Sequence, residues 1–509
     1  MSVSSTKAPE PTLFIDGKWC HSSDGKSREV INPFDASVFT YVDEATTADA
    51  ERAIVSAKKF FTDSDWPHLK CADRVPLLAK TAELLQRDKA ILAKLECHDT
   101  GKAYREAEID VDDVTNTFKY YAKAALDLDH DRVIKSEYLP ETAKNSIRAE
   151  PVGVCTLISP WNFPLLQICW KLAPALATGN VVIIKPSEVT PLTTIHLTKL
   201  LLEAGFPPLS IQLLTAAGSS IGDTICQHDD VDLVSFTGGL QTGRRIIRSC
   251  AEGIKRCCLE LGGKNPNIVF ADMPLDIAID NVTTAVFFHS GQVCSSGTRL
   301  IVEESIADKL VAGVVEKARN IKMGSAFDES TETGPLVSEA HLKKIEAFIE
   351  MGKKEGAKLL VGGSRPDPKK FPELAKGYFF QPTVFDQCDR SMKIVTEETF
   401  GPILTVERFK DGDEARAIFL ANDTKYGLSG GVQSGDVEKA NRVARKMRHG
   451  TIWINNFGPF SPAGEWGGYG ISGNGRELGA SGLDEYIEKK HIWEETQPAL
   501  TEWFAKSKL

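Results

Sequence analysis

Residues 152–184 read VGVCTLISPWNFPLLQICWKLAPALATGNVVII, and this stretch decides the fold class. One apolar run ends at Ile158, a helical pattern covers about 165–177, and a second apolar run extends from Val181 to Ile184. Both runs are short enough for strands that are buried on both faces, as in a parallel sheet. A strand, a helix and a further strand in succession predict one crossover unit of a doubly wound α/β domain.

The same alternation of strand and helix continues along the chain. It gives apolar runs at 211–214 and 233–236, with helical patterns near 191–203, 219–227 and 241–251. A second series has apolar runs at 267–270, 299–302, 403–406 and 451–454, with helical patterns near 275–289, 305–320, 337–353 and 436–448. We therefore expect two doubly wound, Rossmann-like α/β domains.

Domain limits follow from changes in these patterns. The turn at 261–263 separates the two series, so we place a first domain at 1–127 and 151–260 and a second domain at 261–484. Residues 128–150 are polar and interrupt the first domain. Together with the tail at 485–509, they are expected to form a small β arm that serves oligomerisation.

Composition argues against several classes of protein. The 509 residues carry a net charge of −10 with a pI near 5.6, so neither nucleic acid nor an acidic membrane is expected as a partner. Eleven cysteines occur without a C-x-x-C pair, which favours free thiols in the reducing cytoplasm. Residues 1–11 lack the features of a signal peptide, and prolines break the uncharged stretch 151–170, so we expect no membrane helix there.

Cys294 and Glu260 are the most informative pair in the chain. Cys294 lies in GQVCSSG at 291–297, where small neighbours leave its thiol accessible to a substrate. Glu260 directly precedes a Gly-Gly turn and can reach a cavity that the thiol also lines. A nucleophile and a base brought together by the fold are what covalent catalysis requires. Taken alone, Cys294 fits a structural thiol better, and the spacing of His289 gives no firm Cys–His dyad.

Further motifs follow predicted strands, where open α/β sheets bind ligands. Asn162, in ISPWNFP, is a candidate oxyanion donor or else a turn amide. Lys185 and Glu188, in KPSE, suit ribose hydroxyls or else form a solvated ion pair. Residues 233–243, LVSFTGGLQTG, place a glycine turn and a helix start where a pyrophosphate would bind. The literal G-x-G-x-x-G at 468–473 lacks a preceding strand, so we reject it as a dinucleotide motif.

Taken together, these motifs resemble the NAD(P)-dependent aldehyde dehydrogenase superfamily, and its betaine-aldehyde branch most closely. The matches run in order along nearly the whole chain: FIDGKW at 14–19, INP at 31–33, PWNFP at 160–164, KPSE at 185–188, FTG at 236–238, ELGGKNP at 260–266, GQVC at 291–294, EETFGP at 397–402 and SGNGRELG at 472–479. The resemblance implies that the first domain binds NAD and the second is the catalytic domain.

The resemblance also implies roles for individual residues. The catalytic set comprises the nucleophile Cys294, the general base Glu260, the oxyanion amide Asn162, and Lys171 with Glu477 as support for proton relay. The cofactor set comprises Ile158, Ser159, Trp161, Lys185, Ser187, Glu188, Gly218, Gly222, Ser235, Phe236, Gly238, Leu261, Glu398 and Phe400. The charge of Glu188 would repel a 2′-phosphate and so favours NAD over NADP. No catalytic metal is implied, although relatives bind a monovalent cation at positions matching Val30, Ile31, Asp99 and Val189.

The implied reaction oxidises an aldehyde to its carboxylic acid through a cysteine thiohemiacetal and a thioester. Six aromatic residues match the substrate tunnel: Phe163, Trp170, Phe288, Phe457, Phe460 and Trp466. Because aromatic faces bind quaternary ammonium groups, betaine aldehyde is the expected substrate and glycine betaine the product. The alternatives are aminoaldehydes such as 4-aminobutanal and 4-trimethylaminobutanal, or general aliphatic and aromatic aldehydes in an apolar tunnel.

Two further expectations concern activity and assembly. An inactive, merely NAD-binding member of the family is disfavoured by the presence of Cys294, Glu260 and Asn162. The resemblance implies a homo-oligomer, dimer or tetramer, in which the arm at 128–150 and the tail strand near 486–493 pair between subunits.

Overall fold

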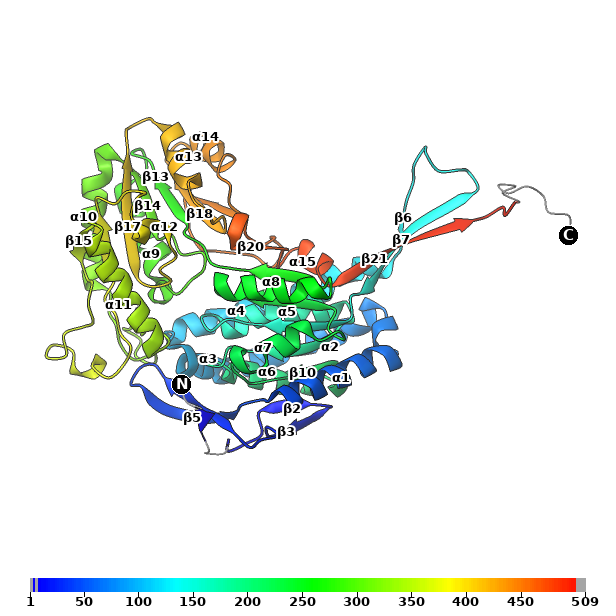
Figure 1. Ribbon diagram of the computed structural model, residues 1–509. Coiled ribbons are helices and arrows are strands. Elements are labelled where there is room, and N and C mark those ends of the chain that lie inside the picture. The colour runs from blue at the N-terminus through cyan, green and yellow to red at the C-terminus, as the bar shows by residue number, and fades with distance from the viewer. Residues whose placement is uncertain (1–2, 5–7, 500–509) are drawn as a thin grey trace.

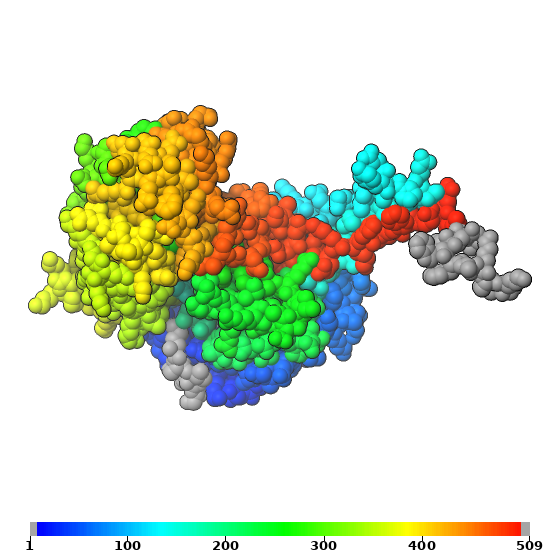
Figure 2. Space-filling model, turned by 45° about the horizontal axis from the view of Figure 1, so that its top comes forward, coloured from blue at the N-terminus to red at the C-terminus, as the bar shows by residue number. Residues whose placement is uncertain are grey.

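The computed structural model describes residues 3–4 and 8–499 and consists of two lobes with a projecting arm (Figure 1). The lower lobe contains the first sheet, and the second lobe lies above it at one end. The space-filling view shows the arm standing away from both lobes (Figure 2). Within the described residues, no helix is both long enough and apolar enough to cross a membrane.

The first lobe is built on an eight-stranded sheet. Its strands, in spatial order, are β20 (Gly473–Asn474), β12 (Arg256–Glu260), β11 (Leu233–Thr237), β8 (Val154–Ile158), β9 (Val181–Lys185), β10 (Ile211–Leu213), β2 (Leu13–Ile15) and β3 (Lys18–Cys20). The five strands from β12 to β10 are parallel, and every residue of the four from β11 to β10 is buried. This burial explains their nearly continuous apolar sequences.

Helices cover both faces of this sheet. One group packs together as α1 (Thr47–Asp63), α7 (Gly218–Gln227) and α8 (Leu240–Glu252), and the other as α2 (Cys71–Arg87), α3 (Lys89–Thr100), α4 (Tyr104–Ala124), α5 (Pro164–Ala177) and α6 (Leu192–Glu203). The chain moves outward from β8 to β10 through α5 and α6, then returns to the other side of β8 as β11. The strand order therefore reverses between β8 and β11, and a crevice for a ligand is expected beyond their carboxyl ends.

The second lobe contains a seven-stranded sheet. Its order is β15 (Lys358–Val361), β16 (Thr383–Asp386), β17 (Ile403–Phe409), β14 (Arg299–Glu303), β13 (Pro266–Val269), β18 (Ser429–Gln433) and β19 (Thr451–Ile454). Its helices are α9 (Leu275–Phe287), α10 (Glu304–Asn320), α11 (Glu339–Lys354), α12 (Lys393–Thr396), α13 (Glu414–Asn422) and α14 (Val437–Ala444). All neighbouring strands are parallel except β15 with β16. Two doubly wound α/β sheets confirm the predicted fold class.

Several loops of the second lobe enter its sheet from the same edge. The loop 261–265 leads from β12 into β13, 292–298 leads into β14, and 400–402 leads into β17. Because these strands are parallel, all three loops lie at the amino ends of the strands. This edge of the second sheet faces the carboxyl edge of the first, and a cavity between them is lined from both lobes.

Two smaller sheets complete the fold. β1 (Val3–Ser4), β4 (Ser27–Asn32) and β5 (Ser37–Asp43) form a separate antiparallel sheet. The arm consists of β6 (Arg132–Val133), β7 (Ala143–Pro151) and β21 (Ile487–Glu495), paired in the order β21-β7-β6 (Figure 1). Residues 500–509 of the predicted arm lie outside the described part of the chain.

The carboxyl-terminal part of the predicted second domain returns to the first lobe. β20 pairs antiparallel with β12, with Gly473 opposite Glu260, and the helix α15 (Ser481–Asp484) packs against α5. The range 261–484 is therefore not a single compact body. A two-residue edge strand has too little periodicity to reveal this return from the sequence.

Candidate active site

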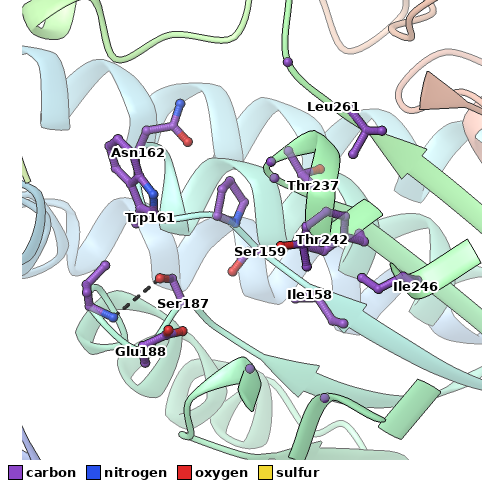
Figure 3. Close-up of a pocket in the computed structure, with 18 of the residues that line it drawn as sticks. Ile158, Ser159, Trp161, Asn162, Ser187, Glu188, Thr237, Thr242, Ile246 and Leu261 are labelled. Carbon is purple, nitrogen blue, oxygen red and sulfur yellow. Dashed lines mark hydrogen bonds between the residues drawn. The ribbon is translucent and has the colours of Figure 1, made fainter. Parts of the chain in front are cut away.

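A cavity of 740 Å³ lies at the switch point of the first sheet, between the two lobes. Sixteen of the predicted catalytic and cofactor residues line it: Ile158, Ser159, Trp161, Asn162, Lys185, Ser187, Glu188, Gly218, Gly222, Phe236, Gly238, Glu260, Leu261, Cys294, Glu398 and Phe400. Figure 3 shows Trp161 and Asn162 on one wall of this cavity, with Thr237, Thr242, Ile246 and Leu261 on another. The structure thus brings together motifs that are up to 242 positions apart, from Ile158 to Phe400.

The glycine turn after β11 presents a free helix start to the cavity. Gly239 is the N-cap of α8 and makes no side-chain cap hydrogen bond. A Cβ atom at Gly238 would lie 2.5 Å from the Phe236 ring, so this position requires glycine. Unsatisfied backbone N–H groups and the helix dipole make such a turn suitable for a pyrophosphate.

Lys185 and Glu188 lie beyond the carboxyl end of β9, at the same cavity. The buried Lys185 ammonium donates to the Pro186 carbonyl at 3.1 Å and lies 3.7 Å from Glu188 Oε2. Burial lowers the pKa of Lys185, while the Glu188 charge opposes that shift. Glu188 remains partly exposed, so its carboxylate can accept hydrogen bonds from ribose hydroxyls.

The charge of Glu260 affects the pKa of the Cys294 thiol. Cys294 is half-buried, and burial followed by the charges of Glu260 and Glu398 raises the pKa of its thiol. Burial and the neighbouring charge of Glu477 also raise the pKa of Glu260 well above its ordinary value. Raised pKa values caused by burial in a cleft are typical of catalytic groups. His289 faces Phe163 and Glu106, so the structure gives no support for a Cys–His dyad.

The Asn162 amide lies against the loop that carries the thiol. Its Nδ2 donates to the Gln292 carbonyl at 2.8 Å, two residues before Cys294. Asn162 also lines the cavity, and an amide nitrogen carries two N–H groups. One N–H is therefore committed to Gln292, and the second remains for a developing oxyanion.

Glu477 and Lys171 form a buried ion pair, and Lys171 also donates to Thr237 Oγ1 at 2.7 Å. Neither residue of the pair lines the cavity, although Thr237 does. The pair influences the site through its charge, because Glu477 raises and Lys171 lowers the pKa of Glu260. A chain of polar groups thus leads from the general-base position into the first lobe.

The comparisons with known proteins agree with this geometry. The model of the aldehyde dehydrogenase family matches residues 19–492. The chain is 49% identical to betaine aldehyde dehydrogenase of Bacillus subtilis over 493 residues, which cover 97% of this chain and 99% of the relative. This chain belongs to the aldehyde dehydrogenase family.

Two further members of the family are similar to this chain over nearly its whole length. Aminoaldehyde dehydrogenase 2 of Solanum lycopersicum is 38% identical over 499 residues, covering 98% of this chain and 97% of the relative. The crystal structure of betaine aldehyde dehydrogenase from Staphylococcus aureus, solved in complex with NAD+, superimposes with a TM-score of 0.94. It is 46% identical, and the alignment covers 98% of this aldehyde dehydrogenase and 97% of the neighbour.

Ser235 requires a correction. We predicted it beside the pyrophosphate, but it does not line the cavity and is fully buried in β11. It lies between Leu157 of β8 and Cys258 of β12. Ser235 lies two residues before the carboxyl end of β11, whereas Phe236 and Thr237 at that end reach the cavity.

The sequence motifs missed one wall of the aldehyde dehydrogenase cavity. The start of α11 contributes residues that no motif identified: Val337, Ser338, Ala340, His341 and Lys344. His341 Nε2 lies 2.8 Å from the Phe400 carbonyl, and the Trp161 ring meets Phe400 edge-on at 5.2 Å. The only available signal was Ser338, whose side chain caps the helix by accepting from His341 N–H.

Glu398 is held tightly at the junction of the lobes. Its Oε1 accepts from Gly263 N–H at 3.0 Å, and a side chain at Gly262 would collide with its carboxylate. Burial raises the pKa of Glu398 to about 7, although the positive charges of Lys344 and Lys264 oppose the shift. The carboxyl thus changes its charge near neutral pH.

Replacing Glu398 by glutamine should change how stability depends on pH. Between the ordinary pKa of 4.5 and about 7, the folded state keeps a proton that the unfolded state releases. The fold therefore loses stability progressively as pH rises through this range, by up to about 3 kcal/mol, because only the unfolded state gains from releasing that proton. Urea unfolding without added NAD+ should show the variant gaining more stability over the parent at pH 8 than at pH 5. Equal differences at both pH values would contradict this assignment.

None of the six predicted substrate-tunnel residues lines the 740 Å³ cavity, and four of them share one aromatic cluster. Trp170 packs edge-on against Phe460 at 5.1 Å and Trp466 at 5.5 Å, in a cluster continued by Trp453 and Phe457. Phe163 packs beside His289 in the same buried core, and Phe288 is 39% exposed. Cys294 packs at the border of the core cluster that contains Trp170 and Trp466.

The predicted cation position has one favourable feature. Asp99 is buried, its Oδ2 accepts from Leu192 N–H at 2.7 Å, and its Oδ1 has no partner among the described residues. The pairing of β4 with β5 is irregular between Val30 and Ile31, and β4 packs against α3, which carries Asp99. The described residues contain no group of three or more His, Cys, Asp or Glu that could hold a metal. A monovalent cation here stays a prediction.

Proposed function

We propose that this aldehyde dehydrogenase oxidises betaine aldehyde to glycine betaine with NAD+. The observation that carries the proposal is the single cavity in which Cys294, Glu260 and Asn162 meet at the switch point of a nucleotide-binding sheet. The relative from Bacillus subtilis and the structural neighbour from Staphylococcus aureus, both betaine aldehyde dehydrogenases, support the choice of substrate and cofactor.

NAD+ fits the residues of the cavity. The bare turn at Gly238 and Gly239 would receive the pyrophosphate, and Lys185 with Glu188 would meet the adenosine ribose. Glu398 and Phe400 would hold the nicotinamide riboside. When bound, NAD+ supplies the acceptor for a hydride.

The protein groups would act in two stages. The Cys294 thiolate attacks the aldehyde carbon, and the Asn162 amide with the Cys294 backbone N–H stabilises the resulting oxyanion. Loss of hydride from that carbon leaves a thioester. Glu260 then takes a proton from water, and the hydroxide attacks the thioester to release the acid and the thiolate.

The substrate's trimethylammonium group would contact the aromatic cluster of Trp170, Phe460 and Trp466. Phe163 is a weaker candidate, because the Lys102 ammonium already lies 4.0 Å from its ring centroid. One face of that ring thus carries a cation of the protein itself. Indole rings bind cations most strongly among aromatic side chains, which favours Trp170 and Trp466 as the anchors.

The test compares kcat/KM for betaine aldehyde, 4-aminobutanal, 4-trimethylaminobutanal and hexanal. We expect betaine aldehyde to be preferred, and Trp170→Leu to lower its kcat/KM by about 30-fold, equivalent to ~2 kcal/mol, with little change for hexanal. Trp19→Leu, in the edge strand β3 and away from the cavity, is the matched control and should change neither value. A preference of the parent for hexanal would refute the aromatic cage. The relative from Solanum lycopersicum makes aminoaldehydes the second candidate.

We also propose that the protein forms a dimer or tetramer through its arm. The arm carries exposed apolar side chains, with Trp493 51% and Ile492 39% exposed on a projecting strand. Such a surface is normally covered by a partner. Sedimentation equilibrium should give a multiple of 55.7 kDa, and a monomer at all concentrations would contradict the proposal.

The eleven cysteines, all free in the structure, support our proposal of a reducing compartment, the cytoplasm. Cell fractionation followed by immunodetection tests this location. Recovery of the protein in an oxidising compartment would overturn it.

A further inference from the structure

A left-handed turn precedes the nucleophile. His289, Ser290 and Gly291 have consecutive positive φ angles of 48°, 51° and 68°. Glycine adopts this conformation freely, but each other residue costs about 1–3 kcal/mol. A side chain at Gly291 would also meet the Gly401 carbonyl oxygen at 2.2 Å. The turn can persist only if its surroundings hold it.

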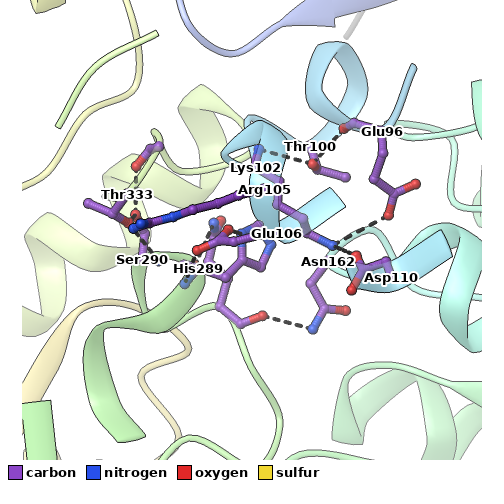
Figure 4. A network of polar contacts seen from close by, with 12 residues as sticks. Glu96, Thr100, Lys102, Arg105, Glu106, Asp110, Asn162, His289, Ser290 and Thr333 are labelled. Atoms are coloured by element: carbon purple, nitrogen blue, oxygen red, sulfur yellow. Dashed lines mark hydrogen bonds and ion pairs between the residues drawn. The ribbon is translucent and has the colours of Figure 1, made fainter. Parts of the chain in front are cut away.

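Two buried side chains hold the turn from different elements. Glu106 of α4 accepts from His289 N–H at 3.3 Å, and Thr333 Oγ1 accepts from Ser290 N–H at 3.1 Å (Figure 4). Ser290 Oγ donates to the Gly334 carbonyl at 2.6 Å, so the 2.8 Å contact between the two hydroxyls is donated by Thr333. Both strained N–H groups are thus satisfied by side chains that are 3% exposed.

Gln292 transmits the conformation of the turn to Asn162. Its backbone N–H donates to the His289 carbonyl at 3.0 Å, and its side chain is anchored by Val337 N–H at 2.9 Å. Its own carbonyl receives the Asn162 amide at 2.8 Å. A change of the turn would therefore rotate the Gln292 carbonyl, displacing the Asn162 amide and the Cys294 backbone N–H together.

We propose that Glu106 and Thr333 are positioning residues that set the oxyanion site by holding this left-handed turn. The inference rests on the proposed roles of Asn162 and Cys294. Neither Glu106 nor Thr333 lines the cavity, so their effect should fall on the chemical step and leave NAD+ affinity intact. Loss of one oxyanion donor costs about 100- to 1,000-fold in rate, and partial displacement should cost about 10- to 100-fold.

The test is Thr333→Val, which keeps the shape of the side chain but removes its hydroxyl. We expect the rate of NADH formation in the first turnover to fall about 10- to 100-fold. This rate is given per active site, and the sites are counted by titration with NAD+. NAD+ affinity should stay within about twofold of the parent, because the cofactor contacts are unchanged. Thr117→Val is the matched control: this buried threonine bonds only the Asp113 carbonyl of its own helix, so the rate should not change.

A second substitution separates positioning from folding. Glycine at 290 adopts the positive φ without strain, so Ser290→Gly in the Thr333→Val background should restore most of the lost rate. If Thr333→Val fails to fold, Glu106→Met and Glu106→Gln replace it. The methionine removes the acceptor for His289 N–H and should slow the first turnover. Glutamine keeps an acceptor, so the rate of the first turnover should stay close to that of the parent.

The outcomes are distinguishable. An unchanged first turnover in Thr333→Val, or a loss that Ser290→Gly does not restore, overturns the positioning role. Failure of the parent protein to produce NADH from any aldehyde in the same assay instead overturns the proposed function.

Discussion

Replacing Cys294 by alanine is expected to abolish NADH production from every aldehyde, a loss of at least about 10,000-fold. Without the thiol no thiohemiacetal forms, so the covalent adduct that must release hydride is missing from the site. The loss should appear in both the first turnover and the steady state. Stopped-flow absorbance of NADH measures both phases in one experiment.

The control for Cys294→Ala is a cysteine far from the cavity. Cys20 is half-buried in β3 and does not line the cavity, so Cys20→Ala should keep full turnover. Cys294→Ala should still bind NAD+, because the cofactor contacts come from other residues. Residual turnover near that of the parent would refute the nucleophile assignment.

Replacing Glu260 by glutamine should slow release of the acid more than formation of the thioester. The steady-state rate should fall by about 100- to 10,000-fold, the usual contribution of a general base, while a burst of NADH remains. The charge of Glu260 raises the pKa of Cys294, so its removal leaves the thiol no harder to ionise. Rapid mixing at several enzyme concentrations should give a burst proportional to the number of sites.

Loss of the burst with an unchanged steady state would contradict the role of Glu260 in deacylation. An equal fall in both phases would place Glu260 at the thiol step instead. A further check uses pH: burial raises the pKa of the Cys294 thiol, so the burst rate of the parent should increase toward alkaline pH.

The fold could be predicted from the sequence because its signal is local. A short apolar run predicted each of three strands that the structure contains: Val154–Ile158, Val181–Lys185 and Leu233–Thr237. The candidate site could be predicted because its residues follow those strands, at the edge where such sheets bind ligands. Asn162 and Lys185 illustrate this, since each lies within four residues of a strand end and lines the cavity.

Other features depended on contacts between distant segments. The start of α11 lines the cavity although no motif marks it, because its position depends on how the second lobe packs over the first. Ser235 was misplaced because a motif match does not say which residues of a strand lie close enough to its carboxyl end to reach the cavity. Lys102 lies on the Phe163 ring although 61 positions separate them in the chain.

The sequence by itself determined two doubly wound α/β sheets, the family, and a thiol with a carboxylate as the chemical pair. These follow from hydrophobic periodicity and from motifs whose meaning is contained in a few consecutive residues. Only the tertiary structure decided that Cys294 and Glu260 share one cavity. It also decided that a strained turn at His289 and Ser290 is held by Glu106 and Thr333. The physical reason is that a buried hydrogen bond or a shared cavity depends on long-range packing, which no local pattern encodes.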